Sequence, residues 1–257
     1  MARSLAGFAT VLSDLMPVTD TIAPSAGMAS LPTPAPIRLQ PAISTPFSHG
    51  IFDSVAIPAG HVAMTMRWVE LNTSDHSAFF TDGCETQFTS ACTSTFGQTT
   101  IAAYETALTE SPFEALTLVN REVNSAIAYQ SDAGNWGVGD YWATPAEIAR
   151  NGRGDCEDYA TAKMWLLLAL GFSPDQLQLV ILQDTRRGLY HAVLAVHLDG
   201  QRYILDNLSN TVRRDSQIGN YMPLISFVAD RTFIHGFDAR RTATAALPTD
   251  LTTVQPG

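Results

Sequence analysis

The sequence predicts an α+β protein in which helices come first and an antiparallel sheet follows. Two observations carry this prediction. Apolar residues recur at helical spacing between about residues 111 and 170, and strand-like runs joined by turn signals occupy residues 177–206. The chain of 257 residues is long enough to bury one good core.

Three helices are predicted in the first of these regions. Residues 111–127 repeat apolar side chains on one face, and Ser111 fits the N-cap position. A second, short helix starts after Thr144 and ends at Gly152. The third helix covers about residues 155–170, where the following glycine closes it.

Three strands are predicted in the second region. They are "LQLVIL", "YHAVLAVHL" and "QRYILD", and the last two are joined by Asp199-Gly200, a strong hairpin signal. With a two-residue loop, Leu198 lies opposite Gln201. The two strands then form an antiparallel pair of defined register.

The charge balance limits the classes of partner. The formal net charge is −10 and the isoelectric point is about 4.9, which disfavours nucleic acid and anionic membrane surfaces. No uninterrupted apolar run approaches the roughly 20 residues that span a bilayer, so membrane insertion is not expected. An acidic chain does leave room for a bound cation.

One folded domain is expected over residues 49–235. Residues 1–48 are rich in Pro, Ser, Thr and Ala and are interpreted as a leader and linker, and residues 236–257 as a flexible tail. The first residues, "MARSLAGFATVL", are interrupted early by Asp14 and Pro17. A degraded signal peptide and a disordered leader fit them equally well.

The chain has three cysteines. Cys84 and Cys92 lie in one short stretch and are expected to form a local disulfide if the protein is exported. The alternative is two free thiols in a reducing compartment. Cys156 is left over in both cases.

Cys156 is placed in the first turn of the third predicted helix, in "GRGDCEDYA". Unsatisfied N–H groups and the helix dipole at this end favour a thiolate. Neighbouring residues of a helix diverge by about 100°, so Asp155 and Glu157 are expected to point away from the sulfur. The acids then need not oppose a nucleophile.

Two of the six histidines, His191 and His197, share one face of a predicted strand. The hairpin register makes Asp206 the diagonal neighbour of His191, within reach of a His–carboxylate hydrogen bond. His197 falls opposite Arg202 near the turn and is expected to be a solvated edge residue. His191 could itself be an ordinary core histidine, but the order Cys, His, Asp favours a base and its orienting acid.

These residues lie in segments that closely resemble a known family. The segments are "WGVGDYWATPAEIARNGRGDCEDYATAKMWLLLALGF" and "YHAVLAVHLDGQRYILDNLSN", and the similarity extends over roughly residues 110–230. The family is the bacterial transglutaminase-like cysteine peptidases, which include periplasmic proteases that release biofilm adhesins. The resemblance implies a papain-like, transglutaminase-type core, with the nucleophile at a helix N-terminus packed on an antiparallel sheet that carries His and Asp. It implies Cys156 as nucleophile, His191 as general base and Asp206 as orienting residue.

The same resemblance implies a calcium site beside the nucleophile. By position its ligands correspond to Asp155, Glu157 and Asp158, and hard carboxylate oxygens suit Ca²⁺. The alternative is that Asp155 caps the helix while the other two acids favour its dipole.

The resemblance further implies a periplasmic location and a protein substrate, for which a large surface adhesin is one candidate. A membrane-bound regulatory receptor is a second implied partner. Two other functions remain open from the residues alone. The same triad could transfer the acyl group to an amine, as a transglutaminase or amidase, or the domain could be a non-catalytic calcium-binding module.

Overall fold

The computed structural model describes residues 49–60, 65–82 and 93–237. The expected leader over residues 1–48, most of the expected tail, and the expected disulfide partners Cys84 and Cys92 lie outside these ranges. In the described part of the chain, no helix is long and apolar enough to cross a membrane.

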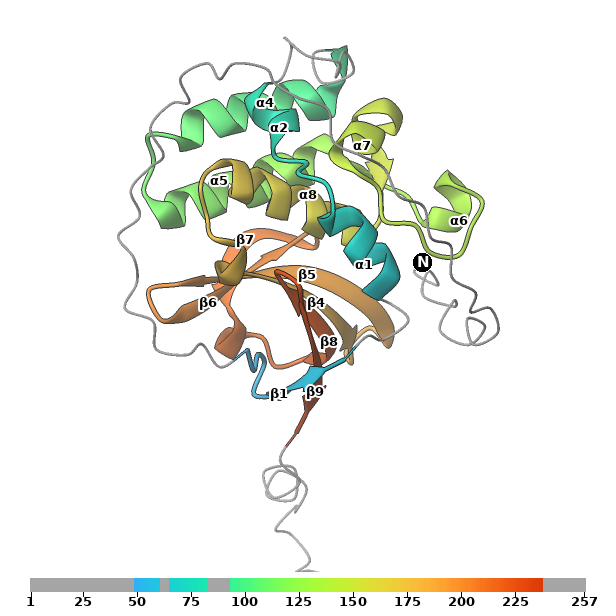
Figure 1. Cartoon of the computed structure of the whole chain (residues 1–257), viewed down its shortest axis with the longest axis vertical. Helices are drawn as coiled ribbons and strands as arrows, with labels where there is room; N and C mark the ends of the chain where they lie inside the picture. Colours follow the sequence, from blue (N-terminus) through green and yellow to red (C-terminus); the bar gives the residue numbers. More distant parts are fainter. Residues whose placement is uncertain (1–48, 61–64, 83–92, 238–257) are drawn as a thin grey trace, which may run out of the picture.

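A seven-stranded antiparallel sheet forms one layer of the molecule, with the order β1-β9-β8-β4-β5-β6-β7 (Figure 1). Its strands are β1 (Val55–Ala59), β4 (Leu177–Asp184), β5 (Leu189–Leu198), β6 (Gln201–Asp206), β7 (Ser209–Arg214), β8 (Tyr221–Val228) and β9 (Arg231–Gly236). Two further short strands, β2 (Ala128–Tyr129) and β3 (Arg153–Gly154), pair in parallel outside this sheet.

The helices gather on one side of the sheet (Figure 1). They are α1 (Thr65–Asn72), α2 (Ala78–Thr81), α4 (Thr95–Ala107), α5 (Pro112–Ala126), α6 (Asp132–Asn135), α7 (Pro145–Asn151) and α8 (Cys156–Ala169). Single 3₁₀ turns lie at Pro174–Gln176 and Asp215–Gln217. The α+β class is therefore confirmed.

Local capping explains why the predicted helices begin and end where they do. The Ser111 hydroxyl accepts the Glu114 N–H at 3.4 Å at the start of α5, and Glu114 reaches back to the Ser111 N–H. Thr144 and Glu147 repeat this capping box at α7. Gly152 then ends α7 with φ of 67°, a left-handed conformation that glycine adopts without a steric penalty.

The predicted hairpin register is confirmed. The pairs of β5 and β6 run from Leu198–Gln201 to Leu194–Leu205. The sequence analysis did not predict the pairing of β1 with β9, which joins the two ends of the described chain. Partners about 180 residues apart leave no local pattern for a short run containing Pro58 to reveal.

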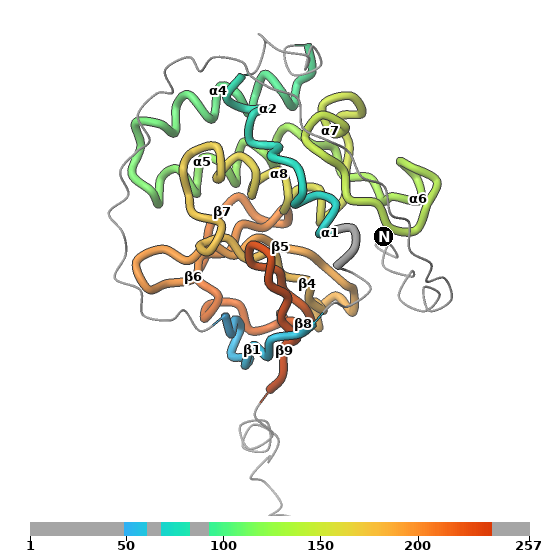
Figure 2. The backbone as a smooth tube through the Cα atoms, viewed as in Figure 1, coloured from blue at the N-terminus to red at the C-terminus, as the bar shows by residue number. Residues whose placement is uncertain are grey.

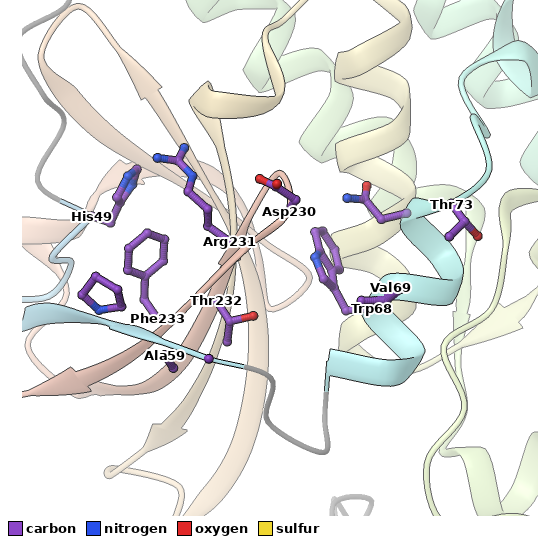
Figure 3. A pocket seen from close by; sticks show the side chains of 12 residues that line it. His49, Ala59, Trp68, Val69, Thr73, Asp230, Arg231, Thr232 and Phe233 are labelled. Atoms are coloured by element: carbon purple, nitrogen blue, oxygen red, sulfur yellow. The ribbon is translucent and has the colours of Figure 1, made fainter. Parts of the chain in front are cut away.

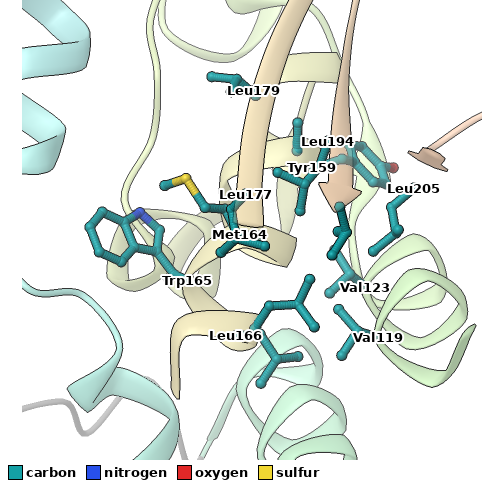
Figure 4. Close-up of a cluster of buried hydrophobic side chains, with 14 of the residues drawn as sticks. Val119, Val123, Tyr159, Met164, Trp165, Leu166, Leu177, Leu179, Leu194 and Leu205 are labelled. Carbon is teal, nitrogen blue, oxygen red and sulfur yellow. The ribbon is translucent and has the colours of Figure 1, made fainter. Parts of the chain in front are cut away.

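Helix α8 forms the centre of the core. Every residue from Cys156 to Leu167 is buried, because the sheet covers one side and α5 the other. Figure 4 shows Leu166 of α8 toward Val119 and Val123 of α5, and Tyr159 of α8 beside Leu194 and Leu205 of the sheet. Burying each such aliphatic side chain stabilises the fold by about 1.5–3 kcal/mol, and this packing fixes the start of α8 against β5.

The opposite face of the sheet has a smaller apolar cluster. Ile51 and Phe52 pack there with Val180, Val193 and Ile204. Figure 2 shows this N-terminal stretch beside the sheet on the side away from α8. Both faces of β5 are therefore buried, and a polar side chain on either face must find a partner within the protein.

Candidate active site

Cys156 is the first residue of α8, and its side chain is buried. Two residues before it, Gly154 of β3 pairs with Tyr129 of β2. A Cβ atom on Gly154 would lie 2.6 Å from the Asp158 carboxylate, which is too close for any side chain. Glycine at this position therefore lets Asp158 fold back against the start of its own helix.

Asp158 ties two chain segments together at this helix start. Its Oδ2 accepts the Asp155 N–H at 3.1 Å, and its Oδ1 accepts the Ala143 N–H at 2.7 Å. Burial raises the pKa of this carboxyl well above its usual range. The two carboxylate oxygens of Asp158 therefore hold the segment at Ala143, before α7, against the start of α8.

Glu157 contacts the thiol directly. The Cys156 Sγ–H donates to Glu157 Oε2 at 3.0 Å, so the expectation that Glu157 points away from the sulfur is wrong. The long Glu side chain folds back to its neighbour because it is fully buried. Burial, and then the charges of Glu157 and Asp155, raise the pKa of Cys156 well above its usual range. A helix start alone therefore does not produce a thiolate in this arrangement.

His191 and Asp206 form a buried pair on adjacent strands. His191 Nε2 lies 2.9 Å from Asp206 Oδ1, which also accepts the Leu208 N–H at 2.9 Å. The Tyr221 hydroxyl donates to Asp206 Oδ2 at 2.6 Å. Burial alone would raise the pKa of Asp206, but the hydrogen bond and charge of His191, with those of Tyr221 and Leu208, lower it to about 2. Asp206 is therefore an ionised carboxylate at neutral pH.

The three predicted catalytic residues lie on elements that pack against one another, because α8 contacts both β5 and β6. Cys156 lies against β5, where the backbone N–H of Ala192, next to His191, hydrogen-bonds the thiol and lowers its pKa. His191 is on β5 and Asp206 ends β6. Because His191 uses Nε2 for Asp206, Nδ1 is its remaining ring nitrogen.

His197 contradicts the expectation of a solvated edge residue. Its side chain is 3% exposed, and its Nε2 lies 2.9 Å from Gln178 Oε1. Burial first, and then the charges of Arg202 and His49, lower the pKa of His197 to about 4. The expectation failed because β5 is an inner strand of the sheet, with β4 and β6 on its two sides.

Two acids that the sequence analysis did not select, Asp132 and Asp140, lie beside the predicted metal ligands. Together with Asp155, Glu157 and Asp158 they form what we call the acidic cluster. Within it, side-chain atoms of three overlapping trios approach within 4.8 Å of one another: Asp155, Cys156 and Glu157; Asp132, Asp155 and Asp158; Asp132, Asp140 and Glu157. Asp132 is 23 residues from Asp155 in the sequence, so only the fold reveals the grouping.

The electrostatics of the acidic cluster favour a cation. Burial, and then the charge of Asp155, raise the pKa of Asp132 to about 7 and that of Glu157 well above its usual range. Asp132 Oδ1 and Glu157 Oε1 are buried and have no hydrogen-bond partner among the residues that the structure describes. Carboxylates this close require protons or a cation to offset their repulsion, and an all-oxygen donor set suits Ca²⁺.

A family model supplies the assignment. The model described as "Bacterial transglutaminase-like cysteine proteinase BTLCP" matches residues 72–223, more than half of the chain. The chain belongs to this family. The resemblance inferred from the motifs is thereby confirmed at the level of the family.

Three solved structures of Legionella pneumophila LapG are similar to this transglutaminase-like proteinase. One is 25% identical, covers 58% of this chain and 83% of its own, and has a TM-score of 0.49. An EGTA-treated form is 25% identical over 57% and 82%, and a calcium-bound form is 26% identical over 54% and 77%, each with a TM-score of 0.49. No curated protein matches the chain.

The proteinase also has a cavity of about 650 Å³ away from these residues. Figure 3 shows it between Trp68 and Val69 of α1 and the β8–β9 turn with Asp230 and Arg231. Neither Cys156 nor any other predicted site residue lines it. The cavity therefore has no part in the arrangement around the thiol.

Proposed function

We propose that this proteinase is an endopeptidase with Cys156 as nucleophile, His191 as general base and Asp206 as orienting residue. The observation that carries the proposal is the buried His191–Asp206 pair on strands packed against the helix that begins at Cys156. Tyr221 and Leu208 hold the carboxylate in place, which fixes the direction of the imidazole.

The chemistry follows from this arrangement. Cys156 Sγ attacks the carbonyl carbon of a peptide bond, and its proton passes to His191 Nδ1. The tetrahedral adduct collapses when His191 gives that proton to the leaving amine. Water then adds to the thioester with His191 as base, the C–S bond breaks, the acid product leaves, and the thiol of Cys156 is regenerated.

The acidic cluster is proposed to hold Ca²⁺. Asp132, Asp155 and Glu157 supply buried oxygens and Asp140 an exposed one. Asp158, a ligand expected from the sequence, keeps only its remaining lone pairs for an ion. A bound Ca²⁺ supplies positive charge that neutralises these carboxylates and so removes their opposition to a thiolate. The donors fit such an ion because two of the buried oxygens have no described hydrogen-bond partner.

The natural substrate is proposed to be a protein outside the cytoplasm, with a large surface adhesin as the first candidate. Family membership supports a protein substrate. By resemblance to the family, we further propose that the protein is located in the periplasm and that a membrane-bound receptor regulates it.

A comparison of cell-surface proteins tests the proposed function. Cells that carry the wild-type chain should release fragments of a surface protein that cells with Cys156→Ala retain. The purified proteins should reproduce this cleavage with Ca²⁺ present. Incorporation of a fluorescent amine at the cleaved site, in place of hydrolysis, would instead identify acyl transfer and overturn the peptidase assignment.

A further inference from the structure

The cavity of about 650 Å³ lies between α1 and the β1–β9 edge of the sheet (Figure 3). Trp68 and Val69 of α1 line one side of it. Ala59 of β1 and Phe233 of β9 line the other side. Val69 is 48% exposed although it lines the cavity. An apolar group that entered would be favoured, because the group and the cavity walls would both leave water.

The charged residues of the cavity do not select a charged ligand. Asp230 and Arg231 carry opposite charges, and the Arg231 guanidinium already pairs with the Asp175 carboxylate. Among the other polar side chains, Asn72 already donates from Nδ2 to the Ala229 carbonyl at 3.0 Å. An uncharged and largely apolar group is therefore the occupant that the walls favour.

The described chain starts at the wall of this cavity. His49 is the first described residue and lines the cavity. Its carbonyl accepts a hydrogen bond from Gln178 Nε2 at 2.9 Å, and its ring centre lies 4.5 Å from that of Phe233. His49 Nδ1 is buried and has no hydrogen-bond partner among the described residues. The backbone is therefore anchored at the cavity, beside a ring nitrogen that can take a further partner.

Connectivity keeps the residues before His49 near the cavity. Two residues span at most about 7 Å, so Phe47 lies within that distance of His49 on any path of the chain. Residues 41–48, "PAISTPFS", include no charged side chain. Pro41 and Pro46 restrict the backbone and so reduce the entropy that docking would remove. The segment thus combines an aromatic side chain, the absence of charge and enforced proximity.

We propose that residues 41–48 dock in this cavity, with the Phe47 ring between Trp68 and Phe233. The docked segment joins α1 to the β1–β9 edge and covers Val69. Its backbone supplies the polar partner for His49 Nδ1. Covalent attachment gives the segment an effective concentration of about millimolar or more, so a weak contact is enough. This docking is independent of the proposed peptidase function.

A double-mutant cycle on the full chain tests the contact, because segment and cavity are changed separately. Phe47→Ala should lower the melting temperature by roughly 3–8 °C, and Val69→Ala by less. The double variant should lose at least about 2 °C less than the sum of the two single losses, because both substitutions remove one contact. Val138, a similarly exposed valine (47%), does not line the cavity. Val138→Ala should therefore add to Phe47→Ala without coupling.

Hydrogen exchange locates the effect. Phe47→Ala should raise the exchange rates of the α1 amides by roughly tenfold and leave those of α8 unchanged. Leu31→Ala, at an apolar residue earlier in the leader, should change neither these rates nor the melting temperature. An unchanged melting temperature for Phe47→Ala, or strict additivity with Val69→Ala, would overturn the docking.

The protein concentration distinguishes docking within one chain from docking between two copies. The melting temperature of the wild type should not depend on concentration. A melting temperature that rises with concentration, and that loses this dependence in Phe47→Ala, would place the ring in a second copy and overturn docking within the chain.

Discussion

Strand β5 carries two histidines, His191 and His197, that share one face and are equally buried. Their surroundings differ in charge. His191 contacts the carboxylate of Asp206, whereas His197 contacts the amide of Gln178. The comparison shows that burial alone does not separate the histidine proposed to be catalytic from the structural one. The ionic character of the partner distinguishes them.

His197, near the end of β5, belongs to an uncharged hydrogen-bond network. Gln178 Nε2 donates to Ser226 Oγ at 2.9 Å and to the His49 carbonyl at 2.9 Å. His235 bridges Ser226 and Ser54, at 2.7 Å on each side. This network ties the N-terminal stretch to the inner strands of the sheet. Its function is therefore to hold the structure together.

The largest expected difference is in activity. His191→Ala and Cys156→Ala should each lower kcat/KM by about 10⁴-fold, with little change in melting temperature. Asp206→Asn should be less severe because nucleophile and base remain. His197→Ala should instead keep kcat and lower the melting temperature. The assignment of roles along β5 would be reversed if His197→Ala removed activity from a folded protein.

Calcium should affect activity through the acidic cluster and should leave the hydrogen-bond network around His197 unchanged. EGTA should lower activity by at least about 100-fold, and Ca²⁺ but not Mg²⁺ should restore it, because Mg²⁺ requires a small octahedral shell. Asp132→Asn should weaken Ca²⁺ binding measured by calorimetry, while Asp184→Asn, a buried carboxylate outside the acidic cluster, should not. Full activity in EGTA without binding heat would leave Asp155 as a helix cap worth about 1 kcal/mol.

Mild acid should lower the free energy of unfolding through the hydrogen-bond network around His197. Burial lowers the pKa of His197 and of His235 from 6.5 to about 4. Between these values the unfolded chain binds more protons, so their stabilising effect is complete above pH 6.5 and is lost as the pH falls toward 4. The loss should be roughly 3 kcal/mol per histidine. Urea unfolding of His197→Gln across this range should show a shallower decline than wild type, and equal slopes would refute this origin.

The smallest effects should come from two side chains of β8. Tyr221→Phe removes the hydrogen bond to Asp206 Oδ2 and should lower kcat by about tenfold, equivalent to about 1.4 kcal/mol. Ser226→Ala removes a link at the other end and should lower stability by about 1–3 kcal/mol without changing kcat. Steady-state kinetics and thermal melts of the two variants distinguish an effect on activity from an effect on stability. A loss of kcat in Ser226→Ala would contradict the purely structural role of the network around His197.

Much of the arrangement around the thiol was predictable because the interactions that set it are local. Ser111, Thr144 and Gly152 start or end helices through contacts within four residues. The Asp199-Gly200 turn sets the β5–β6 register, and that register brings Asp206 beside His191. Helix caps and tight turns depend on a few neighbouring residues, so a single sequence contains the information they need.

Only the tertiary structure decided the features that depend on residues far apart in the chain. The burial of His197 required β4 and β6 on both sides of β5, and the acidic cluster required Asp132 to meet α8. The contact between Glu157 and the Cys156 thiol arose because burial left the carboxylate no water. The sequence by itself selected the residues that are proposed to carry the chemistry and placed the elements on which they lie. Their electrostatic environment was decided by the fold, because desolvation depends on what packs around a group and not on its neighbours in the chain.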